Sequence, residues 1–136
     1  MSDFSFLTRR VRNKPLFLKA DGSCSSALFK DERGVSVSKD MGRPIEKIIE
    51  AEEALNDYYN KMNNRENSDE WKLIRIVSIS KELFDSVDAL LIDTPEQQNP
   101  YHAIIRRNAE IVKLSGHQAK ALAQGCEIIK EYLDER

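Results

Sequence analysis

The chain is poor in cysteine, has no long apolar run and carries no excess of one charge. Only two of its 136 residues are cysteines, Cys24 and Cys126, which excludes a disulfide-stapled secreted scaffold. We expect two unpaired thiols, with Cys126 filling the core, rather than a bridge between them. The longest apolar runs, such as residues 89–92, are far below the roughly 18 residues that a membrane span needs, so no association with a membrane is predicted.

Targeting signals and the common catalytic motifs are also missing. The first residues lack both the basic segment and the apolar segment of a signal peptide, so we expect a soluble, cytoplasmic protein. The sequence contains no G-x-G-x-x-G, no Walker loop, no H-E-x-x-H and no C-x-x-C. With two histidines and two scattered cysteines, it predicts neither a metal site nor a cofactor.

The charge is balanced overall but unevenly distributed. Lys and Arg number 21 against 23 Asp and Glu, a net charge of −2 that argues against a general binder of polyanions. Residues 1–43, however, carry nine basic against five acidic side chains, whereas residues 44–100 carry six against thirteen. These regions either pair with each other or leave room for a local anion site built from Arg9, Arg10 and Arg12.

The length and the apolar content of 40% indicate one folded domain, residues 1–136. Apolar residues at spacings of three and four predict two main helices, about 44–63 and 116–133. Ser115 and Gln118 match the capping-box pattern at the start of the second helix. We predict a single α+β domain in which both helices pack on one face of a mostly antiparallel sheet.

Alternating and short apolar runs predict the strands of this sheet. The segment 4–19 reads as one or two strands, the second at residues 16–18. A hairpin is expected from residues 27–29 and 35–37, around a polar loop that ends in Gly34. The remaining strands are predicted at 71–79, 89–93 and 101–105, with a short helical turn at 80–87.

Two polar segments are candidates for a binding site. Ser25 and Ser26 follow a predicted turn, where hydroxyls either bind a phosphate or carboxylate, or satisfy turn backbone. Asn99 and His102 lie where an exposed loop meets a strand. A histidine held there titrates near neutral pH and suits acid–base work, although a lone histidine is often structural.

Two arginine pairs form the third candidate. Arg9 and Arg10 lie on one predicted strand, and Arg106 and Arg107 lie on another. Adjacent strand residues face opposite sides, so one arginine of each pair is available to grip the same phosphate. The alternative is that they are ordinary solvated or carboxylate-paired arginines.

Several short motifs resemble those of a family of small uncharacterised bacterial proteins. The family shares an arginine-containing first strand, an S-S-x-x-F segment, an L-S-V-like strand and an N-P-x-H-A-x-I segment. This chain has the corresponding segments at 7–11, 25–29, 35–37 and 99–105, with Val35 in place of the usual leucine. The family has no assigned activity. The resemblance therefore implies a group of candidate residues, namely Arg9 or Arg10, Ser25, Ser26 and His102.

These observations support three hypotheses. The first is a binding protein with a polar pocket for an anion: a nucleotide, a phosphorylated molecule or a nucleic-acid end. Its ligand-binding residues would be Arg9, Arg10, Ser25, Ser26, Asn99 and Arg106. The second is a small transferase or hydrolase acting at a phosphate or ribose centre, with His102 as the catalytic acid or base. The third is a protein–protein interaction module or homodimer that uses the 44–63 helix, in which Tyr58 and Tyr59 cannot both face the core.

Overall fold

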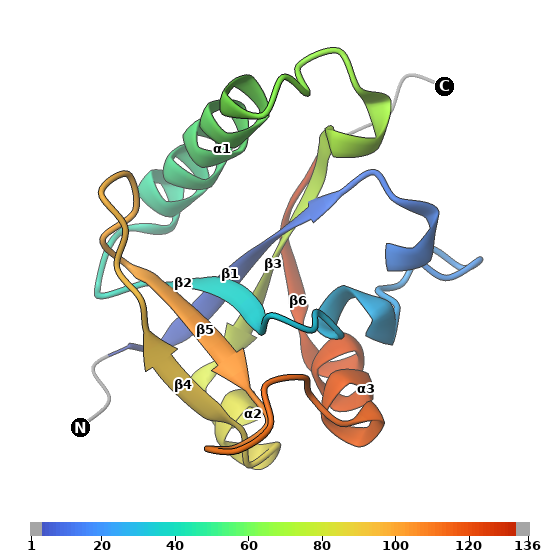
Figure 1. Ribbon diagram of the computed structural model, residues 1–136, viewed down its shortest axis with the longest axis vertical. Helices are drawn as coiled ribbons and strands as arrows, with labels where there is room; N and C mark the ends of the chain where they lie inside the picture. Colours follow the sequence, from blue (N-terminus) through green and yellow to red (C-terminus); the bar gives the residue numbers. More distant parts are fainter. Residues whose placement is uncertain (1–3, 133–136) are drawn as a thin grey trace.

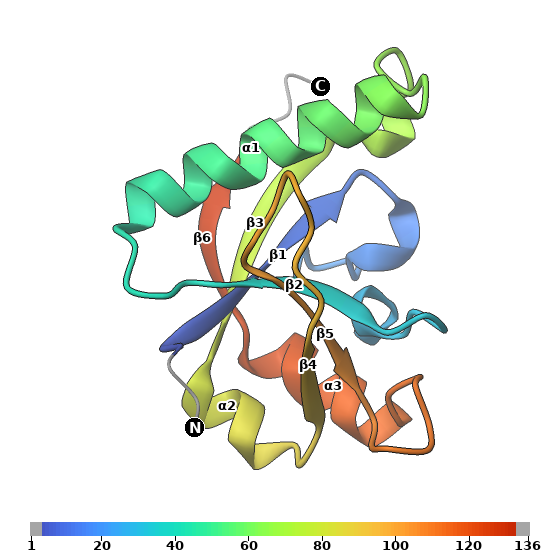
Figure 2. The ribbon, with the colours of Figure 1, turned by 60° about the vertical axis from the view of Figure 1, so that its left-hand side comes forward.

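The computed structural model describes residues 4–132 and shows one six-stranded sheet with helices on two sides (Figures 1 and 2). The strand order is β4-β5-β2-β1-β3-β6, and every neighbouring pair is antiparallel. The predicted single α+β domain with a mostly antiparallel sheet is therefore confirmed. Within residues 4–132, the helices are all too short or too polar to cross a bilayer.

The elements follow the chain in a mixed order. The strands are β1 (Phe6–Arg12), β2 (Val35–Lys39), β3 (Leu73–Ser80), β4 (Leu90–Asp93), β5 (His102–Arg106) and β6 (Glu127–Glu131). The α-helices are α1 (Ile45–Met62), α2 (Lys81–Ser86) and α3 (Gly116–Gly125), and three short 3-10 turns are η1 (Pro15–Phe17), η2 (Ser26–Phe29) and η3 (Asp69–Trp71).

Helices α1 and α3 cover opposite faces of the sheet, which corrects the expectation that both pack on one face. The main core joins Leu7 and Val11 of β1 to Leu122 of α3. Successive strand residues point to opposite faces, so Thr8 projects the other way, and its hydroxyl hydrogen-bonds Glu52 of α1 at 2.8 Å. The expectation was wrong because the helical period determines which side of a helix is buried, but not which face of the sheet that side packs against.

The second predicted helix is shorter than expected. The predicted capping box of Ser115 and Gln118 is present, but α3 ends at Gly125, and Cys126 adopts an extended conformation (φ −68°, ψ 153°). The chain then forms β6, which pairs with the edge of β3. Cys126 and Ile129 are spaced as on a helix, but pairing with the open edge of β3 decides the structure of this segment. Residue 133, the last expected helical position, lies outside the described residues.

The predicted hairpin before α1 is also wrong. Residues 26–29 form the 3-10 turn η2, because the Ser25 hydroxyl accepts a hydrogen bond from the Ala27 N–H and caps it. Leu28 and Phe29 belong to this turn and are buried in the core, so their burial does not require a strand. The expected strand at 16–18 is likewise absent, since residues 15–17 form η1.

Strands β1 and β2 share only a short stretch of pairing, and this positions the candidate site. Their partners are Leu7 with Lys39 and Thr8 with Ser38. Beyond Thr8, β1 continues beside β3 alone, while β2 continues beside β5. The sheet therefore splits between two of its central strands, and the diverging strands are visible in Figure 2.

Candidate functional site

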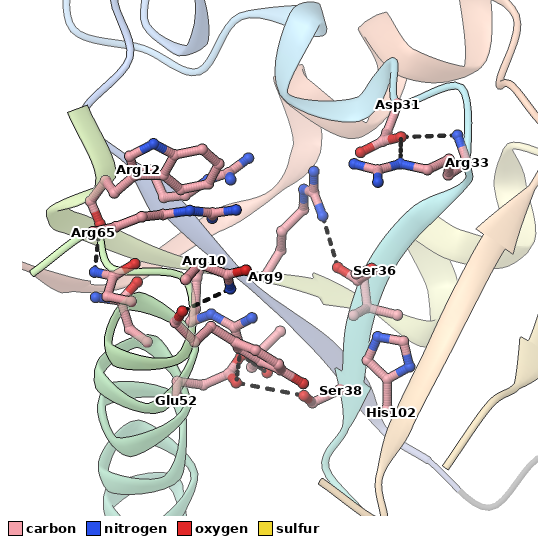
Figure 3. Close-up of a pocket in the computed structure, with 17 residues that line it drawn as sticks. Arg9, Arg10, Arg12, Asp31, Arg33, Ser36, Ser38, Glu52, Arg65 and His102 are labelled. Atoms are coloured by element: carbon pink, nitrogen blue, oxygen red, sulfur yellow. Dashed lines mark hydrogen bonds and ion pairs between the residues drawn. The ribbon is translucent and has the colours of Figure 1, made fainter. Parts of the chain in front are cut away.

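A cavity of about 220 Å³ lies over the split between β1 and β2. Its floor comes from these two strands, and one wall is the C-terminal half of α1. Trp71 also lines the cavity. Figure 3 shows Arg65 at one end and the loop around Asp31 and Arg33 at the other. Five arginines and two carboxylates line the cavity: Arg9, Arg10, Arg12, Arg33 and Arg65 against Asp31 and Glu52.

Arg9 occupies the opening between the strands. Its Nη1 donates to the Ser36 carbonyl at 2.8 Å and its Nε donates to the Leu28 carbonyl at 3.0 Å. The guanidinium thus satisfies a carbonyl of β2 at a point where β1 no longer pairs with β2. Burial, and then the nearby charge of Arg12, lowers the Arg9 pKa from 12.5 to about 10. The group remains cationic at neutral pH.

Arg12 and Arg65 stack on Trp71. Their guanidinium carbons lie 4.3 Å and 3.6 Å from the ring centroid, and Figure 3 shows the two side chains together at one end of the cavity. Burial, followed by the charges of Arg10 and Arg65, lowers the pKa of Arg12. The cavity therefore gathers like charges that destabilise one another.

The other two arginines are paired with acids. Arg10 Nη1 lies 3.1 Å from Glu52, a carboxylate that is only 2% exposed, and Arg33 Nε lies 3.7 Å from Asp31. Among residues 4–132, no carboxylate lies within ion-pair distance of Arg9, Arg12 or Arg65. The cavity consequently keeps an unneutralised excess of positive charge.

Glu52 joins α1 to the sheet through a buried polar network. Its carboxylate accepts hydrogen bonds from Thr8 Oγ1 at 2.8 Å and Ser38 Oγ at 3.4 Å. Asn99 Nδ2 in turn donates to Ser38 Oγ at 2.9 Å. This network fixes the cavity floor to both α1 and the loop between β4 and β5. The tip of that loop also contacts α1, where the Tyr59 hydroxyl donates to Glu96.

His102 lines the cavity from β5, on the side opposite Arg12 and Arg65 (Figure 3). Its Nδ1 lies 3.0 Å from the Thr94 carbonyl and 2.8 Å from Thr94 Oγ1. In the tautomer whose Nδ1–H donates to the Thr94 carbonyl, Nε2 is an acceptor. No described residue hydrogen-bonds Nε2. His102 is thus held by Thr94 with one nitrogen available to a ligand.

The structure brings together only some of the residues that the sequence singles out. Arg9, Arg10 and His102 line one cavity, and Asn99 lies directly behind it through Ser38. Three others do not line it: Ser25, Ser26 and Arg106. Ser25 caps η2, as the turn interpretation expects. Arg106 donates to the Asn108 and Ala109 carbonyls, away from Arg9.

Sequence reasoning missed Glu52, Arg65 and Trp71 as site residues. Glu52 could have been found, because it lies four residues after Ile48 and three before Leu55, on the buried stripe of α1. An acid on such a stripe indicates a buried partner. Arg65 and Trp71 carry no comparable signal, since they reach the cavity only through the path of the chain after α1. Within residues 4–132, no group of three His, Cys, Asp or Glu side chains could hold a metal ion.

The outer face of α1 carries the residues proposed for protein contact. Tyr58 is 39% exposed and Met62 is 60% exposed, whereas Tyr59 is half-buried at the cavity. Tyr58 thus lies at the edge of the buried face of α1, as expected because two adjacent residues of a helix cannot both face the core. The interaction hypothesis itself stays a prediction.

Comparisons of the chain with family models, curated proteins and solved structures gave no significant match.

Proposed function

We propose that the protein binds a small anion bearing a phosphate group in the cavity between β1 and β2. The observation that carries the proposal is the convergence on one cavity of Arg9, Arg12 and Arg65, which have no carboxylate partner in the described part of the chain. Burial, and then repulsion from neighbouring arginines, lowers the pKa values of Arg9 and Arg12. A bound anion would relieve this repulsion.

The chemistry of arginine and the size of the cavity limit which ligands would fit. A guanidinium presents planar pairs of N–H donors that match two phosphate oxygens, which favours phosphate over a simple halide. At about 220 Å³ the cavity is below the roughly 300–1,000 Å³ typical of sites that enclose a drug-sized ligand. It suits the phosphate end of a phosphorylated metabolite or nucleotide, with the remainder of the ligand extending outside.

Calorimetric titration with pyrophosphate tests the proposal, with potassium chloride at matched ionic strength as the control for screening. We expect saturable binding to the wild type. The double variant Arg12→Gln, Arg65→Gln should bind about 100-fold more weakly, because two charge-assisted contacts are lost.

Arg106→Gln is the matched control variant, since this arginine lies outside the cavity and should leave affinity unchanged. The site would be refuted if pyrophosphate gave the wild type no more heat than chloride does. It would also be refuted if Arg106→Gln lost as much affinity for pyrophosphate as the double variant.

Transfer or hydrolysis at a phosphate or ribose centre is a second candidate function. Its support is the orientation of His102, whose Nδ1 is held by Thr94 while no hydrogen bond from residues 4–132 occupies Nε2, the nitrogen that would act as a base. Phosphorus NMR of ribose phosphates incubated with the protein would detect turnover, and His102→Gln should lower any such rate by about 10²–10⁴-fold while preserving pyrophosphate binding. Turnover that persists in the variant would contradict this role.

A further inference from the structure

One polar side chain of the arginine-lined cavity is buried without serving the fold. Asn56 lies on α1 one turn after Glu52, and only 8% of it is exposed. Figure 3 shows Glu52 reaching from α1 towards Ser38, and Asn56 lines the same cavity. Unlike Glu52, Asn56 makes no side-chain hydrogen bond within residues 4–132. An amide withdrawn from water without a protein partner costs free energy, so Asn56 indicates a ligand.

The amide of Asn56 keeps an open edge. Among the described side chains, no fully buried nitrogen or oxygen lacks a hydrogen-bond partner. The Asn56 amide has no such partner, so its oxygen and nitrogen must each reach a space that water or a ligand can enter. Asn56 borders two spaces, the arginine-lined cavity and a groove on the other side of α1. Only the first is lined by arginines, so an anionic ligand held there would lie beside this amide.

Two more amides continue from Asn56 along the same wall. Asn60 and Asn63 follow it at helical spacings of four and three residues, and both line the cavity. Asn60 Nδ2 donates to the Trp71 carbonyl at 3.0 Å, and Asn63 Nδ2 donates to the Tyr59 carbonyl at 2.8 Å. Their Oδ1 atoms accept no hydrogen bond from residues 4–132. This wall therefore offers neutral acceptors, whereas the arginines offer only donors.

We propose that the cavity binds a sugar phosphate, with its hydroxyl groups on Asn56 and Asn60 and its phosphate on the arginines. Binding of this kind depends on the phosphate site proposed above. A hydroxyl group both donates and accepts, so hydroxyls satisfy the donor and the acceptor of Asn56 and the free oxygen of Asn60. A phosphate that carries an apolar group would leave these amides unpaired and would bind more weakly.

The aromatic rings of the cavity argue against a nucleobase as the neutral part of the ligand. Trp71 has the guanidinium groups of Arg12 and Arg65 over its ring, and Tyr59 has that of Arg10 at 5.5 Å from its centroid. A nucleobase gains affinity by stacking on an open aromatic face. The volume of about 220 Å³ also favours a small ligand over a whole nucleotide.

Calorimetric titration with ribose 5-phosphate and methyl phosphate tests the proposal. Both are phosphate monoesters, and only the sugar carries hydroxyl groups. We expect the wild type to bind ribose 5-phosphate about 10-fold more tightly, and we expect pyrophosphate to displace it. Asn56→Leu, which keeps the size of the side chain but not its amide, should reduce this ratio of affinities to about 2-fold. Because Asn56 has no protein partner, the melting temperature of the unliganded variant should not fall.

Asn67→Leu is the matched control variant. Asn67 is exposed and lines the groove but not the cavity, so the ratio of affinities should stay at its wild-type value. A ratio that falls in Asn67→Leu but not in Asn56→Leu would place the sugar in the groove and overturn the proposal.

The wild-type comparison decides the proposal even if Asn56→Leu fails to fold. Equal affinities for the two monoesters, with pyrophosphate still bound, would overturn the sugar phosphate and leave the anion site standing. Ribose 5-phosphate that pyrophosphate does not displace would also overturn it. No binding of any of the three phosphates would refute the anion site together with the sugar phosphate.

Discussion

Helix α1 separates two cavities of opposite charge. On one side is the arginine-lined cavity over the split between β1 and β2. On the other is a larger groove of about 600 Å³, lined by four acids and one lysine: Glu53, Asp57, Glu66, Asp69 and Lys72. Asn56 and Asn60 line both. Positive charge is thus in excess in the cavity on one side of α1, and negative charge is in excess in the groove on the other side.

The two sides differ in how their charges are satisfied. In the acidic groove, Glu53 accepts a hydrogen bond from the Tyr132 hydroxyl and Asp69 accepts one from Asn13 Nδ2, while Asp57 and Glu66 are exposed to water. In the arginine cavity, all the arginines except Arg33 are half-buried, and three of these lack a carboxylate partner among residues 4–132. Unpaired charge that is withdrawn from water, rather than an excess of one sign, is what indicates a ligand.

The neighbours Glu52 and Glu53 give the largest expected difference between the two sides. Glu52→Ala removes a buried carboxylate and leaves Arg10, Thr8 and Ser38 without their partner, so we expect a loss of about 3 kcal/mol in the free energy of unfolding. Glu53→Ala removes one hydrogen bond at the groove and should cost about 1 kcal/mol. Urea denaturation measures both, and equal losses would contradict the asymmetry.

Trp71 should matter for ligand affinity more than for stability. Trp71→Ala removes the surface on which Arg12 and Arg65 stack, so their guanidinium groups lose their fixed positions. We expect pyrophosphate affinity to fall about 10-fold, from contacts of roughly 0.5–1 kcal/mol each. Asp57→Asn in the acidic groove is the control and should change affinity less than about 2-fold, because its exposed charge is screened. A stronger effect of the groove variant would locate the anion elsewhere.

The lowered pKa of Arg9 predicts a pH limit for binding. A base with a depressed pKa in the folded state loses its charge earlier than in the unfolded chain, so Arg9 becomes neutral as pH rises through about 10. Burial of its charged form costs stability below that pH, and the cost is relieved above it. Sulfate keeps its charge over this pH range, so only the charge of Arg9 changes in the pair. We therefore expect the affinity for sulfate to decline above pH 10.

The matched variant for this pH series is Arg9→Gln, which should bind sulfate more weakly and show a smaller decline. Circular dichroism would confirm that the fold persists at each pH. Sulfate affinity that stays constant to pH 11 in the folded wild type would contradict the place of Arg9 in the site.

Local patterns predicted much of the fold. The apolar stripe of α1, the strand at β3 and the cap at Ser115 depend on neighbouring residues, and all three are present. The extent of α3 could not be predicted, because Cys126 and Ile129 fit a helix as well as a strand. Only the open edge of β3, a distant partner, decides between them.

The candidate site was harder to predict for the same reason. Arg9 and His102 were identified by residue type. The cavity, however, exists because β1 stops pairing with β2 after Thr8. This register cannot be predicted from the sequence of either strand alone. Trp71 and Arg65 join the cavity from a segment more than fifty residues after the end of β1. The serines were misplaced because a hydroxyl that caps a turn has the same local sequence as one that binds phosphate.

The most direct test of the arginine cavity is an NMR titration that follows the Nε–Hε signals of the arginines as inorganic phosphate is added. We predict that the signals of Arg9, Arg12 and Arg65 shift together with one dissociation constant, while that of Arg106 stays in place. Shifts spread over the surface arginines, or absent from these three, would contradict an anion site between β1 and β2.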